Sequence, residues 1–282
     1  MGKIISAIDF SDCSINALKH ALSIAKNCNS ELVLVWVGKP ASQQEKFSTF
    51  KEDATEGIRK RFDELIEKYR SQYPGVKFSY KIRKGKVYKE IAAEAKASKA
   101  TLVVAGTHGA SGFDEFWIGS NANRIVSACD CPVITIRGGI NIRRPLHRIV
   151  FPVDSTLETR QKANFTAYLA RHHHAEVHII RLYSSKVDTI RQNVDFYASQ
   201  VAHFFEQEGI VYRMDSLEAT NLADAMISHA REVEANLIAI MTEQETTTSN
   251  LWMGPFAQQV VNHSPIPVLS MHSRELMTIA TS

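Results

Sequence analysis

Long apolar runs are missing from this sequence of 282 residues, and so is an excess of either charge. The longest apolar stretches, such as residues 32–37, have the length of one strand, whereas a membrane-spanning helix needs about 20 apolar residues. The chain carries 33 Lys and Arg against 30 Asp and Glu, a net charge of +3 with neutral histidine. We therefore expect neither a membrane protein nor a protein that binds nucleic acid.

Cysteine is also scarce. The four cysteines give no disulfide framework in a chain of this length and indicate a reducing compartment. The first residues lack the charged region followed by an apolar region that is typical of a signal peptide. The sequence therefore predicts a cytoplasmic location.

The sequence contains one pattern twice. Matching segments follow each other in the same order, first at an offset of 145 residues and later at an offset of 135: 6–11 with 151–156, 31–35 with 176–180, 102–104 with 237–239, and 132–134 with 267–269. Many matches in one order indicate a duplication. We expect two domains, residues 1–138 and 145–275, joined by a linker at 139–144.

Each copy alternates β-branched runs with segments of helical spacing. Such alternation requires parallel strands joined by crossover helices, so the fold class is α/β, with two tandem doubly wound domains. The predicted strands of the first copy are 3–8, 31–37, 76–83, 102–106 and 132–137, and its helices 13–27, 52–72, 87–98 and 120–129. The second copy repeats this pattern, with its first helix predicted over 156–172.

Glycine is concentrated in one stretch: four of the 13 glycines lie between Gly106 and Gly119. The stretch follows a predicted strand and precedes a predicted helix that begins at Ser120. Glycine permits close approach of the backbone, and a helix start offers free N–H groups, a hydroxyl and the positive end of the helix dipole. These parts form an anion cradle, and in a nucleotide the anion is the polyphosphate.

The spacing Gly106-x2-Gly109-x9-Gly119-Ser120 is accompanied by a strand that ends in Ile8-Asp9-Phe10-Ser11 and by Cys131-Pro132-Val133. Together these motifs resemble the universal stress protein family, and the resemblance covers nearly the whole chain as a tandem pair. It implies a five-stranded parallel sheet in the order 3-2-1-4-5 in each domain, and an ATP site in members with this glycine pattern. The order places a switch point between the first and fourth strands, where open α/β sheets bind ligands.

The resemblance also implies the residues of the ATP site. Asp9 matches the family's acidic residue on the adenosine side, and Val37 matches a backbone contact to adenine. On the phosphate and ribose side the matching residues are Ala105, Gly106, Gly109, Gly119, Ser120 and Asn121. Many relatives carry Val or Thr at the position of Asn121, a change that leaves the backbone N–H in place. We expect Mg²⁺ with the ATP, because clustered phosphate charge needs neutralising.

The second copy departs from this pattern, and only two glycines follow residue 140. We expect its side chains to fill the equivalent pocket, so that the second domain is degenerate and one ATP binds per chain. Asp154 repeats Asp9, but without the cradle it is expected to be structural. The replacements are Met241 for Gly106, Gln244 for Gly109 and Pro255 for Ser120.

No catalytic residue is predicted. The sequence has neither a Gly-Lys-Ser/Thr phosphate motif nor a recognisable nucleophile and base. We expect an ATP-binding regulatory protein of the stress response that acts as a binding module. Two alternatives stay open: a slow ATPase or phosphotransferase that uses the same site, and a nucleotide-free interaction scaffold. The client protein cannot be read from the sequence.

Two further expectations concern packing. The last strands, Val133–Arg137 and Val268–Met271, are predicted edge strands that pair antiparallel across a pseudo-two-fold axis, since free strand edges need cover. Whether two such chains form a homodimer is left open. The three consecutive histidines His172–His174 align with the helix end at residues 27–29, and this favours a solvated turn over a metal site.

Overall fold

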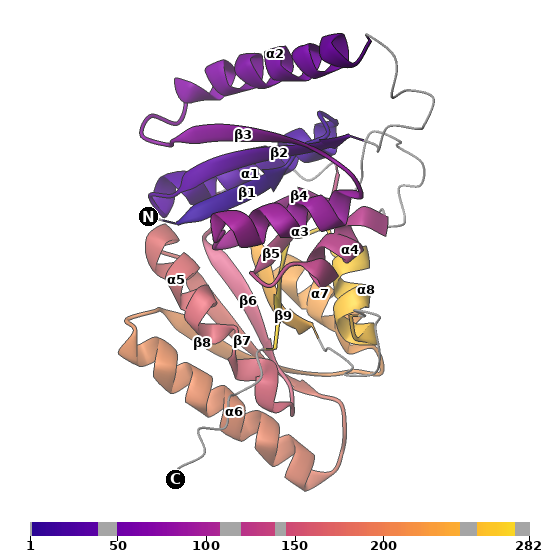
Figure 1. The fold of residues 1–282 in the computed structure, drawn as a ribbon. Helices are drawn as coiled ribbons and strands as arrows, with labels where there is room; N and C mark the ends of the chain where they lie inside the picture. Colours follow the sequence, from indigo (N-terminus) through magenta and orange to yellow (C-terminus); the bar gives the residue numbers. More distant parts are fainter. Residues whose placement is uncertain (1, 39–49, 108–119, 139–144, 243–252, 274–282) are drawn as a thin grey trace, which may run out of the picture. The chain divides into compact units, whose positions relative to one another are not determined.

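A computed structural model describes residues 2–38, 50–107, 120–138, 145–242 and 253–273 (Figure 1). The chain divides between Pro145 and Leu146 into two compact units, which we call unit 1 and unit 2. The expected linker, 139–144, lies outside the described residues. The expected antiparallel pairing of the last strands stays a prediction.

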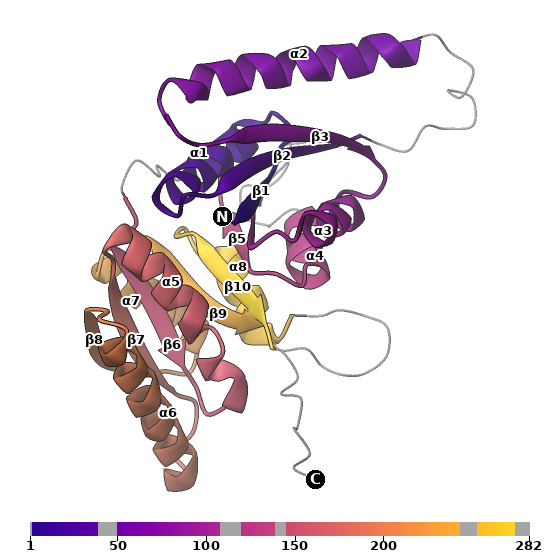
Figure 2. The same cartoon turned by 60° about the vertical axis from the view of Figure 1, so that its left-hand side comes forward.

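Unit 1 is a parallel sheet with helices on both faces (Figure 2). Within the described residues its strand order is β3-β2-β1-β4-β5, which confirms the predicted 3-2-1-4-5. Helices α3 and α4 pack against each other, and α1 packs on β1 and β4. The elements are β1 (Lys3–Ala7), α1 (Asp12–Asn27), β2 (Glu31–Gly38), α2 (Phe50–Arg70), β3 (Phe78–Lys84), α3 (Val87–Ser98), β4 (Leu102–Gly106), α4 (Ser120–Ala128) and β5 (Val133–Ile136).

Helix α1 shows why these residues form these elements. Its N-cap Ser11 accepts a hydrogen bond from the Ser14 N–H at 3.2 Å, which satisfies one of the free donors of the first turn. Leu18 and Leu22, one turn apart, are fully buried on its sheet-facing side. The central strands β1 and β4 are buried along most of their length, as expected for a parallel sheet covered on both faces.

Unit 2 repeats the architecture, with the order β8-β7-β6-β9-β10 in the described residues. Helices α7 and α8 pack against each other, and α6 packs on β7. The elements are β6 (Arg148–Val153), the 3₁₀ helix η2 (Leu157–Arg160), α5 (Ala163–His173), β7 (Glu176–Tyr183), α6 (Asp188–Gln207), β8 (Tyr212–Glu218), α7 (Leu222–Glu232), β9 (Leu237–Thr242), α8 (Pro255–His263) and β10 (Val268–His272). No helix in the described ranges is both long and apolar enough to cross a lipid bilayer.

The first helix of unit 2 corrects one prediction. In place of a continuous helix over 156–172, a 3₁₀ turn is followed by α5, and Lys162 lies between them. The sequence repeat explains the break, because unit 1 has Gly106 where unit 2 has Met241. In unit 1 the first turn of α1 lies so close to Gly106 that a Cβ there would be 2.8 Å from Cys13 Sγ. A side chain at position 241 is therefore incompatible with so close an approach of the first turn to the strand end.

Candidate functional site

The loop after β1 is built around Asp9. One carboxylate oxygen, Oδ1, accepts hydrogen bonds from the N–H of Ser11 at 3.0 Å and from its hydroxyl at 2.6 Å. The backbone N–H of Asp9 in turn donates to Ser14 Oγ at 3.4 Å. These bonds fix the carboxylate at the start of α1, where the helix dipole stabilises negative charge. The residue that the sequence singled out is therefore held in one place at the carboxyl end of β1.

Phe10, next to Asp9, has a left-handed backbone with φ of 65°. Such a conformation costs about 1–2 kcal/mol for a bulky residue and needs surrounding contacts to hold it. The Phe10 ring lies 5.0 Å from that of Phe62 of α2, which stacks on Tyr80 at 4.8 Å. The Arg61 guanidinium lies 4.0 Å from the Phe10 ring centre. Sequence reasoning missed this cluster, since nothing local to Phe10 indicates its partners.

Val37 lies at the end of β2, one of the two strands that pair with β1. Alternate residues of a strand inside a parallel sheet direct their N–H and C=O groups to opposite neighbours. The Val35 carbonyl accepts from the Ile8 N–H at 2.8 Å, whereas the Gly38 carbonyl accepts from the Gly85 N–H on the β3 side at 3.0 Å. Val37 therefore turns its backbone groups toward β1, beyond the last residue pair of the two strands, Ala7 with Val35.

Gly106 ends β4, the other neighbour of β1. Its missing side chain has a structural cause, since an added Cβ would lie 2.8 Å from Cys13 Sγ and 3.1 Å from the Cys13 carbonyl. Glycine here thus lets α1 approach the strand end. The adjoining Ala105 is buried and pairs with Thr135 of β5. A contact of either residue with a ligand stays a prediction, and Ala105 would make it through its backbone.

The register of the sheet brings the ends of β1, β2 and β4 together, and with them Asp9, Val37, Ala105 and Gly106. Helix α4 begins at Ser120, and Asn121 in its first turn is exposed. Gly109 and Gly119 lie outside the described residues. The described part of unit 1 therefore unites an acidic turn, the backbone of a strand end directed toward β1, and a helix start near the predicted switch point.

Unit 2 repeats the acidic turn bond for bond. Asp154 Oδ1 accepts from the Thr156 N–H at 2.8 Å and from the Thr156 hydroxyl at 2.5 Å. The Asp154 N–H donates to Thr159 Oγ1 at 3.2 Å, as Asp9 does to Ser14. Conservation of this turn between the copies supports the expected structural role of Asp154.

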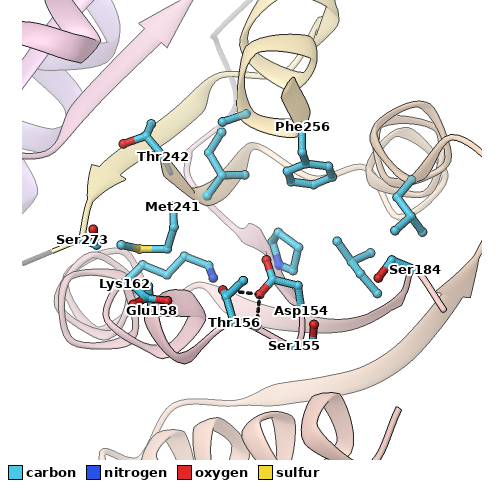
Figure 3. A pocket seen from close by; sticks show the side chains of 15 residues that line it. Asp154, Ser155, Thr156, Glu158, Lys162, Ser184, Met241, Thr242, Phe256 and Ser273 are labelled. Carbon is cyan, nitrogen blue, oxygen red and sulfur yellow. Dashed lines mark hydrogen bonds between the residues drawn. The ribbon is translucent and has the colours of Figure 1, made fainter. Parts of the chain in front are cut away.

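The cleft beside that turn is open, which corrects the expectation that side chains fill it. The described residues of unit 2 enclose a cavity of about 430 Å³. Figure 3 shows Asp154 and Thr156 on one side of it and Met241 and Phe256 across from them. Met241 and Phe256 occupy the positions of Gly106 and Asn121, so this cavity is the counterpart of the unit 1 site.

Lys162 lines this cavity and is only 1% exposed. Its ammonium group donates to the carbonyl and, at 3.3 Å, to the hydroxyl of Thr159, and it lies 4.3 Å from the centre of the Phe151 ring. Burial lowers the pKa of Lys162 from 10.5 to about 7, although the charge of Asp154 acts in the opposite direction. Sequence reasoning missed Lys162, yet a signal existed: it replaces Ala17, a residue of the buried stripe of α1.

The histidine run at the end of α5 is only partly solvated. His172 and His174 are exposed, as predicted, but His173 is 7% exposed. Burial, together with the nearby imidazoles of His172, His147 and His174, lowers the pKa of His173 from 6.5 to about 4. No group of three potential metal-binding side chains lies together in the described part of the chain.

Comparison with known protein families matches the universal stress protein family twice, over residues 1–137 and 145–272. The chain belongs to this family. The two matches correspond to units 1 and 2, so it is a tandem member. The resemblance deduced from the glycine spacing and the strand ends is thereby confirmed.

Individual relatives agree with this assignment. Universal stress protein MJ0531 of Methanocaldococcus jannaschii is 31% identical over 144 residues, which cover 48% of this chain and 81% of that protein. Universal stress protein YxiE of Bacillus subtilis is 29% identical over 145 residues, 48% of this chain and 98% of that one. A solved universal stress protein from Archaeoglobus fulgidus covers 96% of this chain and 98% of its own, with a TM-score of 0.76 at 16% identity. That last likeness concerns the fold alone.

Proposed function

We propose that unit 1 binds one molecule of ATP with Mg²⁺ and that the protein acts in the stress response as a nucleotide-dependent binding module. The observation that carries the proposal is the convergence of Asp9, Val37 and Gly106 on the carboxyl ends of adjacent strands. In the order 3-2-1-4-5 this edge holds the switch point, where open α/β sheets bind nucleotides. The family membership and the glycine spacing that continues into α4 support the same proposal.

The described residues fit an adenine nucleotide. The Val37 backbone, turned toward the end of β1, offers a donor and an acceptor of the kind that an adenine edge pairs with. Asp9 is an acceptor suited to ribose hydroxyls, and Ser120 and Asn121 present backbone N–H groups at the start of α4. We propose that Gly109 and Gly119 complete the phosphate cradle. Mg²⁺ would bind together with the nucleotide, on its phosphates, whose charge it neutralises.

Catalysis is not part of the proposal. A hydrolase needs a positioned attacking group with a base that orients it, and the sequence motifs supply neither. A dedicated ATPase would show many turnovers per bound nucleotide, lost in both Asp9→Ala and Gly109→Val, whereas we expect no sustained turnover.

We further propose a cytoplasmic location, consistent with four cysteines that are all thiols.

Native mass spectrometry with Mg-ATP tests the binding site and its stoichiometry. We expect one ATP per chain, and a loss of affinity of at least tenfold in Gly109→Val, because a β-branched side chain there blocks the approach of phosphate to the backbone. The matched control is Gln244→Val, which makes the same residue at the equivalent position of the second copy. It is expected to bind as the parent does. Two equivalent sites, or an unaffected Gly109→Val, would overturn the proposal.

A further inference from the structure

The cavity of unit 2 combines a buried amine with a mixed lining, in which apolar side chains lie beside hydroxyls and two carboxylates. Lys162 is the sole cationic side chain among the described residues that line it. The cavity is also lined by the half-buried carboxylate of Asp154 and the exposed carboxylate of Glu158. These charges disfavour an anionic ligand, including a phosphate. The cavity therefore differs in chemistry from the proposed nucleotide site of unit 1.

The opposite wall is apolar. It is formed by side chains from four elements of unit 2: Leu182, Leu222, Ile240, Met241 and Phe256. With a volume of about 430 Å³, the cavity has the size of small-molecule pockets, which combine apolar walls with a few convergent polar groups. A ligand that fits has a compact apolar body and one polar end directed at Lys162 and Asp154.

The position of Lys162 is fixed from several sides. Thr159 accepts hydrogen bonds from its nitrogen through both the carbonyl and the hydroxyl, and the Phe151 ring packs beneath it. The same Thr159 hydroxyl accepts from the backbone N–H of Asp154. Figure 3 shows the nitrogen of Lys162 beside Thr156 and Asp154 at the cavity edge. An amine held in this way does not need to be ordered when a ligand arrives.

We propose that the cavity of unit 2 takes small neutral aldehydes or ketones with an apolar body and holds them as a reversible imine on Lys162. The neutral Nζ attacks the carbonyl carbon and forms the C–N bond. The nitrogen gives up both of its protons and the carbonyl oxygen leaves with them as water, so that amine plus carbonyl yields imine plus water. Asp154 is the group placed to carry a proton from nitrogen to oxygen.

The ionisation of Lys162 supports this chemistry. With a pKa of about 7, about half of the Lys162 side chains are neutral at pH 7. An ordinary lysine, with a pKa near 10.4, is neutral in fewer than about one molecule in a thousand at that pH. A desolvated lysine in an apolar pocket is a recognised form of activated amine nucleophile. The unit 2 cavity supplies both the desolvation and the space for a carbonyl partner.

Reductive trapping tests the proposal on the full chain. The protein is incubated at pH 7 with butanal and cyanoborohydride, which converts an imine into a stable secondary amine, and the modified sites are mapped by peptide mass spectrometry. We expect Lys162 to be modified at least tenfold faster than the exposed lysines Lys19 and Lys186. The advantage of Lys162 over the exposed lysines is expected to shrink as the pH rises above about 7, because the exposed amines then lose protons while Lys162 is already neutral. Because the sites are compared within one protein, the result does not depend on the folding of a variant.

Two variants test whether trapping depends on Lys162 and on its ionisation. Asp154→Asn removes the charge that raises the pKa of Lys162, so the pH profile of trapping is expected to move to lower pH. Lys162→Met keeps the length of the side chain and should abolish trapping in this segment while leaving labelling of Lys19 unchanged. Trapping at Lys162 no faster than at the exposed lysines, or protection of Lys162 by butanal without a reducible adduct, would overturn the proposal. Neither result bears on ATP binding by unit 1.

Discussion

At the scale of single residues, Gly106 is the position where one methyl group should matter most. A Cβ there meets Cys13 Sγ at 2.8 Å, a distance that real Cβ atoms do not tolerate. We therefore expect Gly106→Ala to lower the free energy of unfolding by about 1–3 kcal/mol through overpacking. Urea denaturation followed by circular dichroism measures this change.

Gly57→Ala is the matched control. Gly57 lies within α2 with open space around its Cα, so alanine should raise helix stability by about 0.5–1 kcal/mol. Adding Cys13→Ala to Gly106→Ala should recover part of the loss, because it removes the Sγ contact and leaves the backbone contacts at 3.1 Å. Equal stability of Gly106→Ala and the parent would show that α1 does not depend on the glycine.

Asp9 and Gly106 could be identified as site residues from the sequence, but not all the contacts that explain them could be predicted from it. The acidic turn could be predicted because its partner Ser11 is two residues away. The contact of Gly106 with Cys13 could not, since 93 residues separate them and only the fold brings them together. The same holds for the left-handed Phe10, whose ring is held by Phe62.

At the scale of elements, the last turn of α5 carries a buried, neutral imidazole. The pKa of His173 is about 4 in the fold and 6.5 in the unfolded chain, so between these values the unfolded state binds more protons. By linkage, stability falls as pH drops through this window, by roughly 3 kcal/mol from this group at pH 4. His173→Cys, which places there the residue found at the equivalent position in unit 1, should lose correspondingly less stability between pH 7 and pH 4.

Thermal unfolding at a series of pH values measures that difference. The exposed neighbour His172 provides the control, because His172→Cys makes the same replacement without removing a buried imidazole. It is expected to retain most of the acid sensitivity of the parent, because the buried imidazole remains and only the repulsion from His172 is removed. If His173→Cys and the parent lost stability in parallel down to pH 4, His173 would not be the source.

Most elements could be predicted from periodicity, because buried stripes and β-branched runs are local properties of the sequence. The break between η2 and α5 could not, since the helical pattern continues through Lys162. The physical reason is long range: unit 2 has Met241 where unit 1 has Gly106, and a side chain there excludes the close approach that α1 makes to β4. Met241 and Lys162 both line the cavity of unit 2, so the altered strand end and the buried lysine belong to one site.

At the scale of the whole molecule, the duplication was the most secure prediction, because many ordered matches leave no other simple explanation. What the repeat could not show is how far the two copies have diverged in chemistry. The acidic turn is kept in both, at Asp9 and at Asp154. The strand-end glycine is lost in one copy, and with it the geometry that we assign to nucleotide binding.

This asymmetry predicts a one-sided response to nucleotide. A ligand at 100 times its Kd stabilises the folded form by about 2.7 kcal/mol, which slows exchange through unfolding about 100-fold. With Mg-ATP at that level, hydrogen exchange should slow in unit 1, most clearly around Val37, Gly106 and the start of α4. Peptides of unit 2 around Leu182 and Met241 should exchange as they do without ligand, and Gly109→Val should remove the effect from unit 1. Equal protection of both units would mean that the altered cavity still accepts ATP.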